Sequence, residues 1–243
     1  MISQRSKQRD DPSRFYDLLA ETYDRERFGC RCGSILNDTE LNIVANLVFP
    51  GQRVLDAGAG TGRFSFEMAL FAKHVVALDA ARQMTRRAVV RTTDTPRSVC
   101  FVSGDVASLP FSAGAFDAVI CVKLLSHYED ANPYIGELAR VLRRGGKLVL
   151  DVPNAFARAY RPFARNPGIR SETDYFHSTA ELRAIFQKHS LTITRRVTYS
   201  ALPSSLVHFV MCPHPKLAPD GFLRKIYSSR KGVLCFLEGI KQQ

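Results

Sequence analysis

The stretch VLDAGAGTGRF at residues 54–64 decides the fold of this chain of 243 residues. A short apolar run ends in Asp56, and Gly58, Gly60 and Gly62 follow at alternate positions before an apolar helical pattern begins. This order predicts a β-strand, a tight turn and the first turn of a helix. Because glycine has no Cβ, the turn can adopt positive φ and let a ligand lie against the backbone. We therefore expect a nucleotide-like ligand at this turn.

The glycine spacing excludes two common nucleotide motifs. A dinucleotide fingerprint reads G-x-G-x-x-G, which would require a glycine at position 63, where the chain has Arg63. A P-loop reads G-x-x-x-x-G-K-[ST], and no such string occurs in the chain. The turn therefore suits a ligand that needs no pyrophosphate site.

Further strands with acidic ends follow at regular intervals. The apolar run 75–79 ends in Asp79, and the run 99–106 leads into Asp105. Residues 116–121 predict a fourth strand, and residues 138–151 predict a helix, a glycine pair that ends it, and a fifth strand. Alternation of strands and helices predicts a parallel sheet with crossover helices.

From Val54 to Asp151, D-x-G-x-G-x-G and the motifs after it resemble the class I S-adenosylmethionine (SAM) dependent methyltransferases. The resemblance is closest to the ubiquinone/menaquinone-biosynthesis-like group of small-molecule enzymes. It implies an α/β, Rossmann-like fold with a seven-stranded mixed sheet, whose last strand is antiparallel, and helices on both faces. It also implies SAM as the cofactor.

The resemblance also assigns cofactor-binding residues by position. Asp79 would hold the ribose hydroxyls, and Asp105 and the backbone of Val106 would address the adenine. Met84 would pack on the adenine face or simply in the core. The side of the pocket that holds the aminoacyl chain would be formed by Asp56, Gly58, Gly60 and Gly62.

The chain divides into three parts. Residues 1–50 predict an N-terminal helical cap, because their Tyr-Asp spacing is typical of the family's segment that folds over the cofactor. Residues 51–212 predict the SAM-binding domain, with an acceptor-side insert at 155–177 that is rich in arginine and aromatic residues. Residues 213–243 predict a basic C-terminal extension. Tyr23, Tyr160 and Tyr175 are candidate acceptor-binding residues.

The region after the insert predicts a second set of elements. Ser178 and Glu181 have the spacing of a capping box, and the helix that follows ends near residue 189. Residues 191–199 alternate as a strand, with 205–212 as its antiparallel partner at the end of the sheet. In the extension, residues 222–240 favour a basic amphipathic helix, which would lie on an anionic membrane or pack on the protein itself.

Composition narrows the class of protein. The net charge is +11, and residues 156–243, with 14 basic and five acidic side chains, account for most of it. Such a surface attracts an anionic acceptor, a nucleic acid or an anionic membrane, or it only aids solubility. No apolar run reaches the roughly 20 residues of a membrane span, the first residues lack a secretory signal, and the six cysteines lack zinc spacing. We therefore expect a cytoplasmic protein without a metal.

The chemistry requires an acceptor placed in line with the sulfonium and, for some acceptors, removal of a proton. His127, just after the fourth strand, is the first candidate base or a packing residue, and His177 is the second. The chain lacks the [DN]-P-P-[YF] motif of base methylation, the Pro-Cys dipeptide of cytosine methylation and the paired glutamates of arginine methylation. A small-molecule acceptor is favoured, and the alternatives are RNA methylation and a non-catalytic SAM-binding protein.

Overall fold

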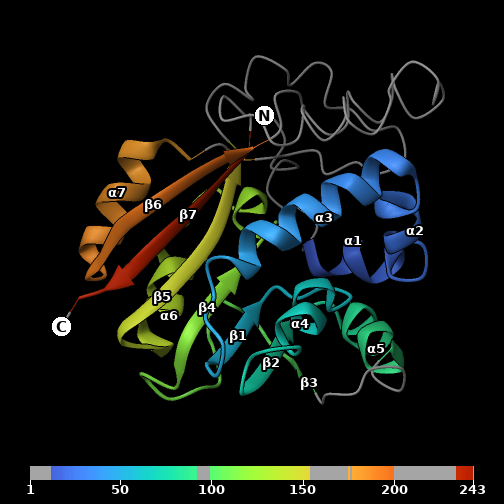
Figure 1. Cartoon of the computed structure of the whole chain (residues 1–243), viewed down its shortest axis with the longest axis horizontal. Coiled ribbons are helices and arrows are strands. Elements are labelled where there is room, and N and C mark those ends of the chain that lie inside the picture. The colour runs from blue at the N-terminus through green and yellow to red at the C-terminus, as the bar shows by residue number, and fades with distance from the viewer. Residues whose placement is uncertain (1–11, 92–98, 154–174, 176, 200–233, 243) are drawn as a thin grey trace, which may run out of the picture.

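The computed structural model describes residues 12–91, 99–153, 175, 177–199 and 234–242 as an α/β fold (Figure 1). Within these residues the strands form one seven-stranded sheet in the order β3-β2-β1-β4-β5-β7-β6. Neighbouring strands from β3 to β5 are parallel, and β7 is antiparallel to both β5 and β6. The strands are β1 Arg53–Ala57, β2 His74–Asp79, β3 Val99–Ser103, β4 Phe116–Cys121, β5 Leu142–Pro153, β6 Leu191–Tyr199 and β7 Leu234–Lys241. The predicted mixed sheet with an antiparallel last strand is confirmed.

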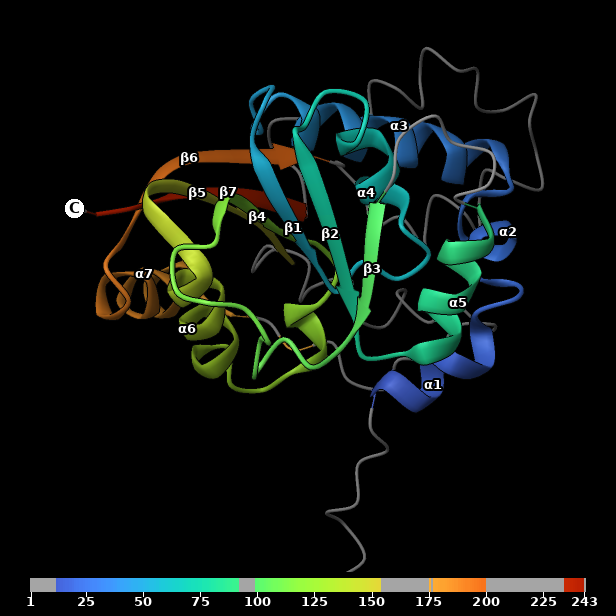
Figure 2. The same cartoon turned by 90° about the horizontal axis from the view of Figure 1, so that it is seen from below.

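Helices cover both faces of the sheet (Figure 2). One face carries α3 (Arg31–Ala45) and α4 (Arg63–Met68), and the other carries α6 (Asn132–Val141) and α7 (Thr179–Lys188). The N-terminal helices α1 (Pro12–Leu19) and α2 (Tyr23–Phe28) lie near α5 (Arg82–Arg91), toward the β3 edge. A 3-10 turn, η2 (Leu125–His127), follows β4.

The core has two halves because the sheet is buried on both sides. Side chains alternate along each strand, so Val54 of β1 packs under α3 and α4 while Leu55 packs under α6. Both side chains are completely buried. This two-sided burial explains why the parallel strands read as continuous apolar runs in the sequence.

The glycine pair before the fifth strand does not end the preceding helix, which corrects the prediction. Helix α6 already ends at Val141, and Leu142 is extended and pairs with Phe116 of β4. The pair lies inside β5, where Gly145 has a φ of 71°. A Cβ at Gly146 would lie 2.9 Å from the carbonyl oxygen of Asp117. These glycines therefore serve an irregular stretch of strand, where the β4–β5 register shifts.

The C-terminal residues differ most from the prediction. Residues 234–241 form β7, between β5 and β6, so the helix expected over 222–240 is wrong for this part. The final strand expected at 205–212 lies outside the described residues, as do residues 222–233 and most of the insert at 155–177. A strand in this place is stabilised by two neighbours, which an amphipathic pattern in isolation does not reveal.

Two other predictions for the C-terminal part of the chain are confirmed. Ser178 and Glu181 form the capping box at the first turn of α7, with the Ser178 side chain accepting from the Glu181 backbone N–H. The strand predicted at 191–199 is β6. On the N-terminal side, the part of residues 1–50 that the structure describes contains the helices α1, α2 and α3.

Candidate functional site

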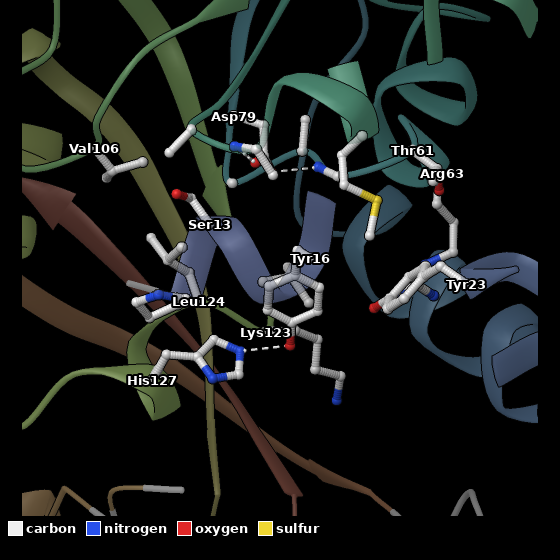
Figure 3. A pocket seen from close by; sticks show the side chains of 18 of the residues that line it. Ser13, Tyr16, Tyr23, Thr61, Arg63, Asp79, Val106, Lys123, Leu124 and His127 are labelled. Atoms are coloured by element: carbon white, nitrogen blue, oxygen red, sulfur yellow. Dashed lines mark hydrogen bonds between the residues drawn. The ribbon is translucent and has the colours of Figure 1, made fainter. Parts of the chain in front are cut away.

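A pocket lies at the carboxyl ends of β1, β2 and β4, where the chain order of the sheet reverses. Such a reversal is where open α/β sheets bind ligands. The empty space between its walls, with the open mouth included, is about 860 Å³. Figure 3 shows that α1 and α2 contribute side chains opposite the strand ends. The predicted site residues that line it are Tyr23, Gly58, Gly60, Asp79, Met84, Asp105, Val106 and His127.

The glycine turn has the backbone that the sequence predicts. Gly58, Gly60 and Gly62 have φ values of 79°, 55° and 80°, a region that residues with a Cβ rarely adopt. The position of a Cβ on Gly60 has no heavy atom within 4 Å, whereas one on Gly58 would lie 3.0 Å from a methyl carbon of Leu124. Gly60 thus leaves the pocket open, and Gly58 allows the turn to approach the loop after β4.

Asp79 joins the glycine turn to the first turn of α5. One carboxylate oxygen accepts from the Gly60 backbone N–H at 2.7 Å, and the other accepts from the Ala81 N–H at 2.8 Å (Figure 3). Burial raises the pKa of Asp79, and the two backbone N–H groups oppose this rise. Each carboxylate oxygen can accept a second hydrogen bond. Asp79 can therefore bind two ligand hydroxyls without releasing the backbone.

The residues predicted for the adenine lie on the neighbouring wall. Met84 is buried, with 1 % of its surface exposed, yet it lines the pocket from α5. Asp105 and Val106 follow β3 and line the same pocket, and an Asp105 oxygen accepts from the Ala107 N–H at 2.9 Å. The side chains of Met84 and Val106 offer apolar surface beside a carboxylate, which is suitable for a flat ring with an amino group.

Two of the predicted cofactor-binding residues do not line the pocket. Asp56 is buried behind the glycine turn, where it accepts from the Ser65 hydroxyl at 2.6 Å. Burial raises the pKa of Asp56 to about 6. Gly62 is the N-cap of α4, and a Cβ there would lie 2.9 Å from the Phe66 ring. Both residues shape the turn from behind.

The two candidate bases differ in position. His127 lines the pocket, and its Nε2 lies 2.9 Å from the Tyr16 hydroxyl of α1. His177 lies behind the turn that carries His127, and its Nε2 is 3.2 Å from the Leu125 carbonyl oxygen and 3.1 Å from that of Tyr128. Because carbonyls only accept, this nitrogen carries a proton. His177 thus holds the turn in place and does not line the pocket.

The tyrosines predicted to bind the acceptor also differ in position. Tyr23 of α2 lines the pocket beside the glycine turn. The Tyr175 backbone N–H donates to the Ser126 carbonyl at 2.7 Å, so Tyr175 supports the same turn as His177. Tyr160 lies outside the described residues.

The N-terminal helices are fixed over the pocket by side chains of α1 and α2. Asp17 accepts from the Gln83 N–H of α5 at 2.7 Å. Asp24 accepts from the Thr61 hydroxyl of the glycine turn at 2.7 Å and pairs with Arg91 at 2.9 Å. The Tyr-Asp pairs of the sequence thus contact the core on two sides, Tyr16 and Tyr23 facing the pocket.

Sequence reasoning missed several residues at this site. Arg63 and Lys123 line the pocket, and both pair with the buried Glu40 of α3 at 2.8 Å. Arg63 was visible as the residue that breaks the dinucleotide motif, and its guanidinium lies 4.1 Å from the Phe64 ring centroid. No local pattern indicates Glu40 or Lys123, because they meet only in the folded chain.

A family model described as a methyltransferase domain matches residues 55–150. The chain therefore carries a methyltransferase domain. The matched region runs from within β1 to within β5 and contains the pocket residues from Gly58 to Tyr128. The methyltransferase domain predicted from the glycine motif is thus confirmed for these residues.

Named relatives share this methyltransferase domain. Demethylmenaquinone methyltransferase of Renibacterium salmoninarum is 34% identical over 144 residues, which is 59% of each protein. Ubiquinone biosynthesis O-methyltransferase of Xanthomonas oryzae pv. oryzae is 37% identical over 130 residues, 51% of this chain and 54% of that protein. The match thus spans less than two thirds of the length of either relative.

Solved structures share the fold over nearly the whole chain. A SAM-dependent methyltransferase from Thermotoga maritima has a TM-score of 0.69 at 20% identity, covering 96% of this chain and all of that one. Magnesium protoporphyrin IX methyltransferase from Synechocystis, solved with S-adenosylhomocysteine, has a TM-score of 0.64 at 22% identity over 96% and 100%. At these identities the likeness is one of fold.

Two further observations concern the part of the chain that the structure describes. There, no helix has both the length and the apolar character needed to cross a membrane. In the same residues, no group of three His, Cys, Asp or Glu side chains is arranged to hold a metal ion.

Proposed function

We propose that this protein is a SAM-dependent methyltransferase that acts on a small-molecule acceptor. The observation that carries the proposal is Asp79, which is fixed by the N–H groups of Gly60 and Ala81 at the wall of the pocket. The carboxylate keeps acceptor capacity for the two ribose hydroxyls. The open space at Gly60 and the Met84, Asp105 and Val106 wall fit the two ends of the same ligand.

When bound, SAM supplies a methyl group on a sulfonium, which an acceptor lone pair attacks while the electrons of the broken S–CH₃ bond stay on sulfur. The protein has to align the acceptor and to take its proton where the accepting atom carries one. Tyr16 and His127 lie at the pocket wall within hydrogen-bond distance of each other. We assign them proton removal: Tyr16 takes the acceptor proton as it gives its own to Nε2 of His127.

A small acceptor is supported by the shape and lining of the pocket. Tyr16, Tyr23 and His127 present ring surfaces, and the Tyr16 ring makes edge contacts with both of the others at 5.9 and 5.3 Å. Aromatic walls with a few polar groups favour a planar molecule. The names of the two relatives, demethylmenaquinone methyltransferase and ubiquinone biosynthesis O-methyltransferase, support the same class.

Calorimetric titration with S-adenosylhomocysteine, with NAD as the control, tests the cofactor. We expect micromolar binding of S-adenosylhomocysteine alone, because Asp79 and the wall beside Met84 suit a ribose and an adenine, whereas the glycine spacing is not that of a dinucleotide motif. If neither compound binds to the folded protein, the proposed function is wrong. Micromolar binding of both would contradict the assignment of the glycine turn.

The acceptor is tested separately by methyl transfer from labelled SAM to phenolic and anionic aromatic compounds. We expect turnover that falls at least tenfold in Tyr16→Phe and in His127→Gln. Transfer to RNA, with binding that weakens steeply as salt rises, would favour the alternative of an RNA methyltransferase. Tight binding of S-adenosylhomocysteine without turnover on any acceptor would favour the non-catalytic alternative.

A further inference from the structure

A buried polar network lies beside the pocket, and none of its members is among the residues proposed to hold the cofactor. It consists of Glu40 from α3, Arg63 from α4, Lys123 after β4, Asp151 from β5 and Tyr199 from β6. We call these five residues the Lys123 network. Glu40, Asp151 and Tyr199 are 0 %, 4 % and 1 % exposed. In Figure 3 the Lys123 amine points away from Asp79 and from the ring of His127.

The Lys123 ammonium group is fully engaged within this network. Its Nζ lies 2.8 Å from Glu40 Oε1, 3.1 Å from Asp151 Oδ2 and 3.1 Å from the Tyr199 hydroxyl oxygen. An ammonium group has three N–H donors and no acceptor. Three oxygens therefore occupy all three donors, and none is left for a ligand. Although Lys123 lines the pocket, it is not built to bind an anionic acceptor.

The charges of the network cancel. Glu40 pairs with Lys123 through one oxygen and with Arg63 through the other, and both distances are 2.8 Å. The Tyr199 hydroxyl donates to Glu40 at 2.8 Å. Two carboxylates thus face two cations in a buried place, where an unpaired charge is strongly destabilising. Loss of Lys123 alone would leave Asp151 without a countercharge.

Asp151 binds Lys123 at two points. While Oδ2 contacts Nζ, Oδ1 accepts from the Lys123 backbone N–H at 2.5 Å. At this residue the backbone has a φ of 62°, which is unfavourable for a side chain that carries a Cβ. The double contact stabilises this left-handed conformation, which redirects the chain as it leaves β4.

The redirected chain carries the residues that face the ligands. Leu124 follows and approaches Gly58, so closely that a Cβ on Gly58 would lie 3.0 Å from its methyl carbon. The turn η2 comes next, with the His127 N–H donating to the Leu124 carbonyl at 3.0 Å. His127 then reaches Tyr16. A change at Lys123 therefore alters the direction from which His127 approaches the pocket.

We propose that Lys123 is a positioning residue: by neutralising Asp151 it keeps that side chain bonded to the backbone N–H of residue 123, and this bond fixes the left-handed turn after β4 and so places His127 against Tyr16. It does not contact substrate. The inference rests on the proposed function for the role of His127, but the position of His127 can be measured without any methyl transfer.

Three variants separate positioning from ligand binding. Lys123→Met keeps an unbranched side chain and removes the charge, leaving Asp151 unpaired. The double variant Lys123→Met with Asp151→Asn restores charge balance, and the amide oxygen of Asn can still accept from the backbone N–H of residue 123. Arg143→Met is the matched control, because Arg143 is half exposed and pairs with Asp117 at the opposite end of β4.

The first measurement is the imidazole NMR signal of His127, assigned with His127→Gln. Tyr16→Phe gives the position of the signal when the Tyr16 bond is absent. We expect Lys123→Met to move the signal to the Tyr16→Phe position, the double variant to return it to the wild-type position, and Arg143→Met to leave it unmoved. If Lys123→Met does not fold, the wild-type signal in the double variant remains the deciding result.

The second measurement compares S-adenosylhomocysteine with methylthioadenosine, which lacks the carboxylate and the amine. We expect the ratio of the two affinities in the double variant to lie within twofold of the wild-type ratio. A tenfold smaller ratio would overturn the proposal, because Lys123 would then bind the ligand carboxylate. A wild-type His127 signal in Lys123→Met, or a Tyr16→Phe-like signal in the double variant, would overturn it as well. Wild-type protein that binds neither compound would contradict the proposed function and leave the NMR result intact.

Discussion

Three aspartates near this site have distinct environments, although each lies toward the carboxyl end of a strand. Asp79 accepts two backbone N–H groups at the pocket wall. Asp56 is buried with the Ser65 hydroxyl, and Asp151 is bound to Lys123. The surroundings therefore decide that one aspartate faces the pocket, one supports the glycine turn and one supports the loop after β4.

Substitution of Asp79 tests the ribose site. We expect Asp79→Ala to weaken binding of S-adenosylhomocysteine at least tenfold, which is about 1.4 kcal/mol, for the lost pair of charge-assisted hydrogen bonds. Calorimetric titration measures it. Asp117→Ala is the control, since Asp117 lies at the other end of the sheet and pairs with Arg53 and Arg143. Unchanged affinity in Asp79→Ala would remove this residue from the site.

The raised pKa of Asp56 predicts a pH dependence of stability opposite in sign to that of a carboxylate paired with a cation. Its folded pKa is raised to about 6 from a usual 3.8, so its contribution to stability is greatest below pH 3.8 and is lost as pH rises through 6. Asp56→Asn keeps an oxygen for Ser65 and removes the ionisation. Between pH 4 and pH 7 the ionisation of Asp56 destabilises the wild-type protein but not this variant. We therefore expect the free energy of unfolding of the variant, measured relative to that of the wild type, to be higher at pH 7 than at pH 4, by up to about 3 kcal/mol. Urea unfolding at both pH values measures this, and an identical pH dependence in both proteins would refute it.

At the scale of elements, a stability measurement distinguishes an internal strand at residues 234–241 from the surface helix that the sequence favours. Phe236 in β7 is completely buried and stacks on Tyr199 with ring centroids 5.2 Å apart. We expect Phe236→Ala to lower the free energy of unfolding by roughly 3–5 kcal/mol, as for large-to-small changes in cores. A surface helix would predict a small effect instead. Chemical denaturation measures it, with the exposed Phe49→Ala as the control; a loss below about 1 kcal/mol would argue against an internal strand.

At the scale of the whole molecule, the Lys123 network links four elements and the loop after β4, which are distant in sequence. The buried charges of Lys123 and Arg63 outweigh the effect of burial and hold the pKa of Glu40 at about 2. Because its folded pKa lies below the usual 4.5, the stability it contributes is present above pH 4.5 and is lost as pH falls through 2.

Acid unfolding therefore provides a test of the network. We expect the free energy of unfolding to fall by up to about 3 kcal/mol between pH 4.5 and 2 through Glu40 alone. In Glu40→Gln this part of the pH dependence should disappear, while stability at pH 7 drops because Lys123 and Arg63 then face one carboxylate. Thermal unfolding measured across this pH range gives the comparison. An acid limb of equal slope in both proteins would contradict the assignment.

Local sequence determined the parts of this protein that depend on neighbouring residues. Strand, glycine turn and helix at 54–64 follow from one contiguous pattern, because only glycine adopts the positive φ of Gly58, Gly60 and Gly62 without strain. Asp79, Asp105 and His127 followed from their order after successive strands, since parallel strands bring their carboxyl ends to one edge. The capping box at Ser178 followed from a spacing of three residues.

Tertiary structure alone decided the rest. Residues 234–241 became an internal strand because β5 and β6 offer hydrogen bonds on both sides, which outweighs the helical pattern. The amine of Lys123 meets Glu40, Asp151 and Tyr199, which lie 83, 28 and 76 positions away in the sequence, only in the folded chain. His177 holds a turn and does not line the pocket, because burial placed its ring against two carbonyl groups. Burial and charge pairing act between segments that only folding brings together, so no local pattern could report them.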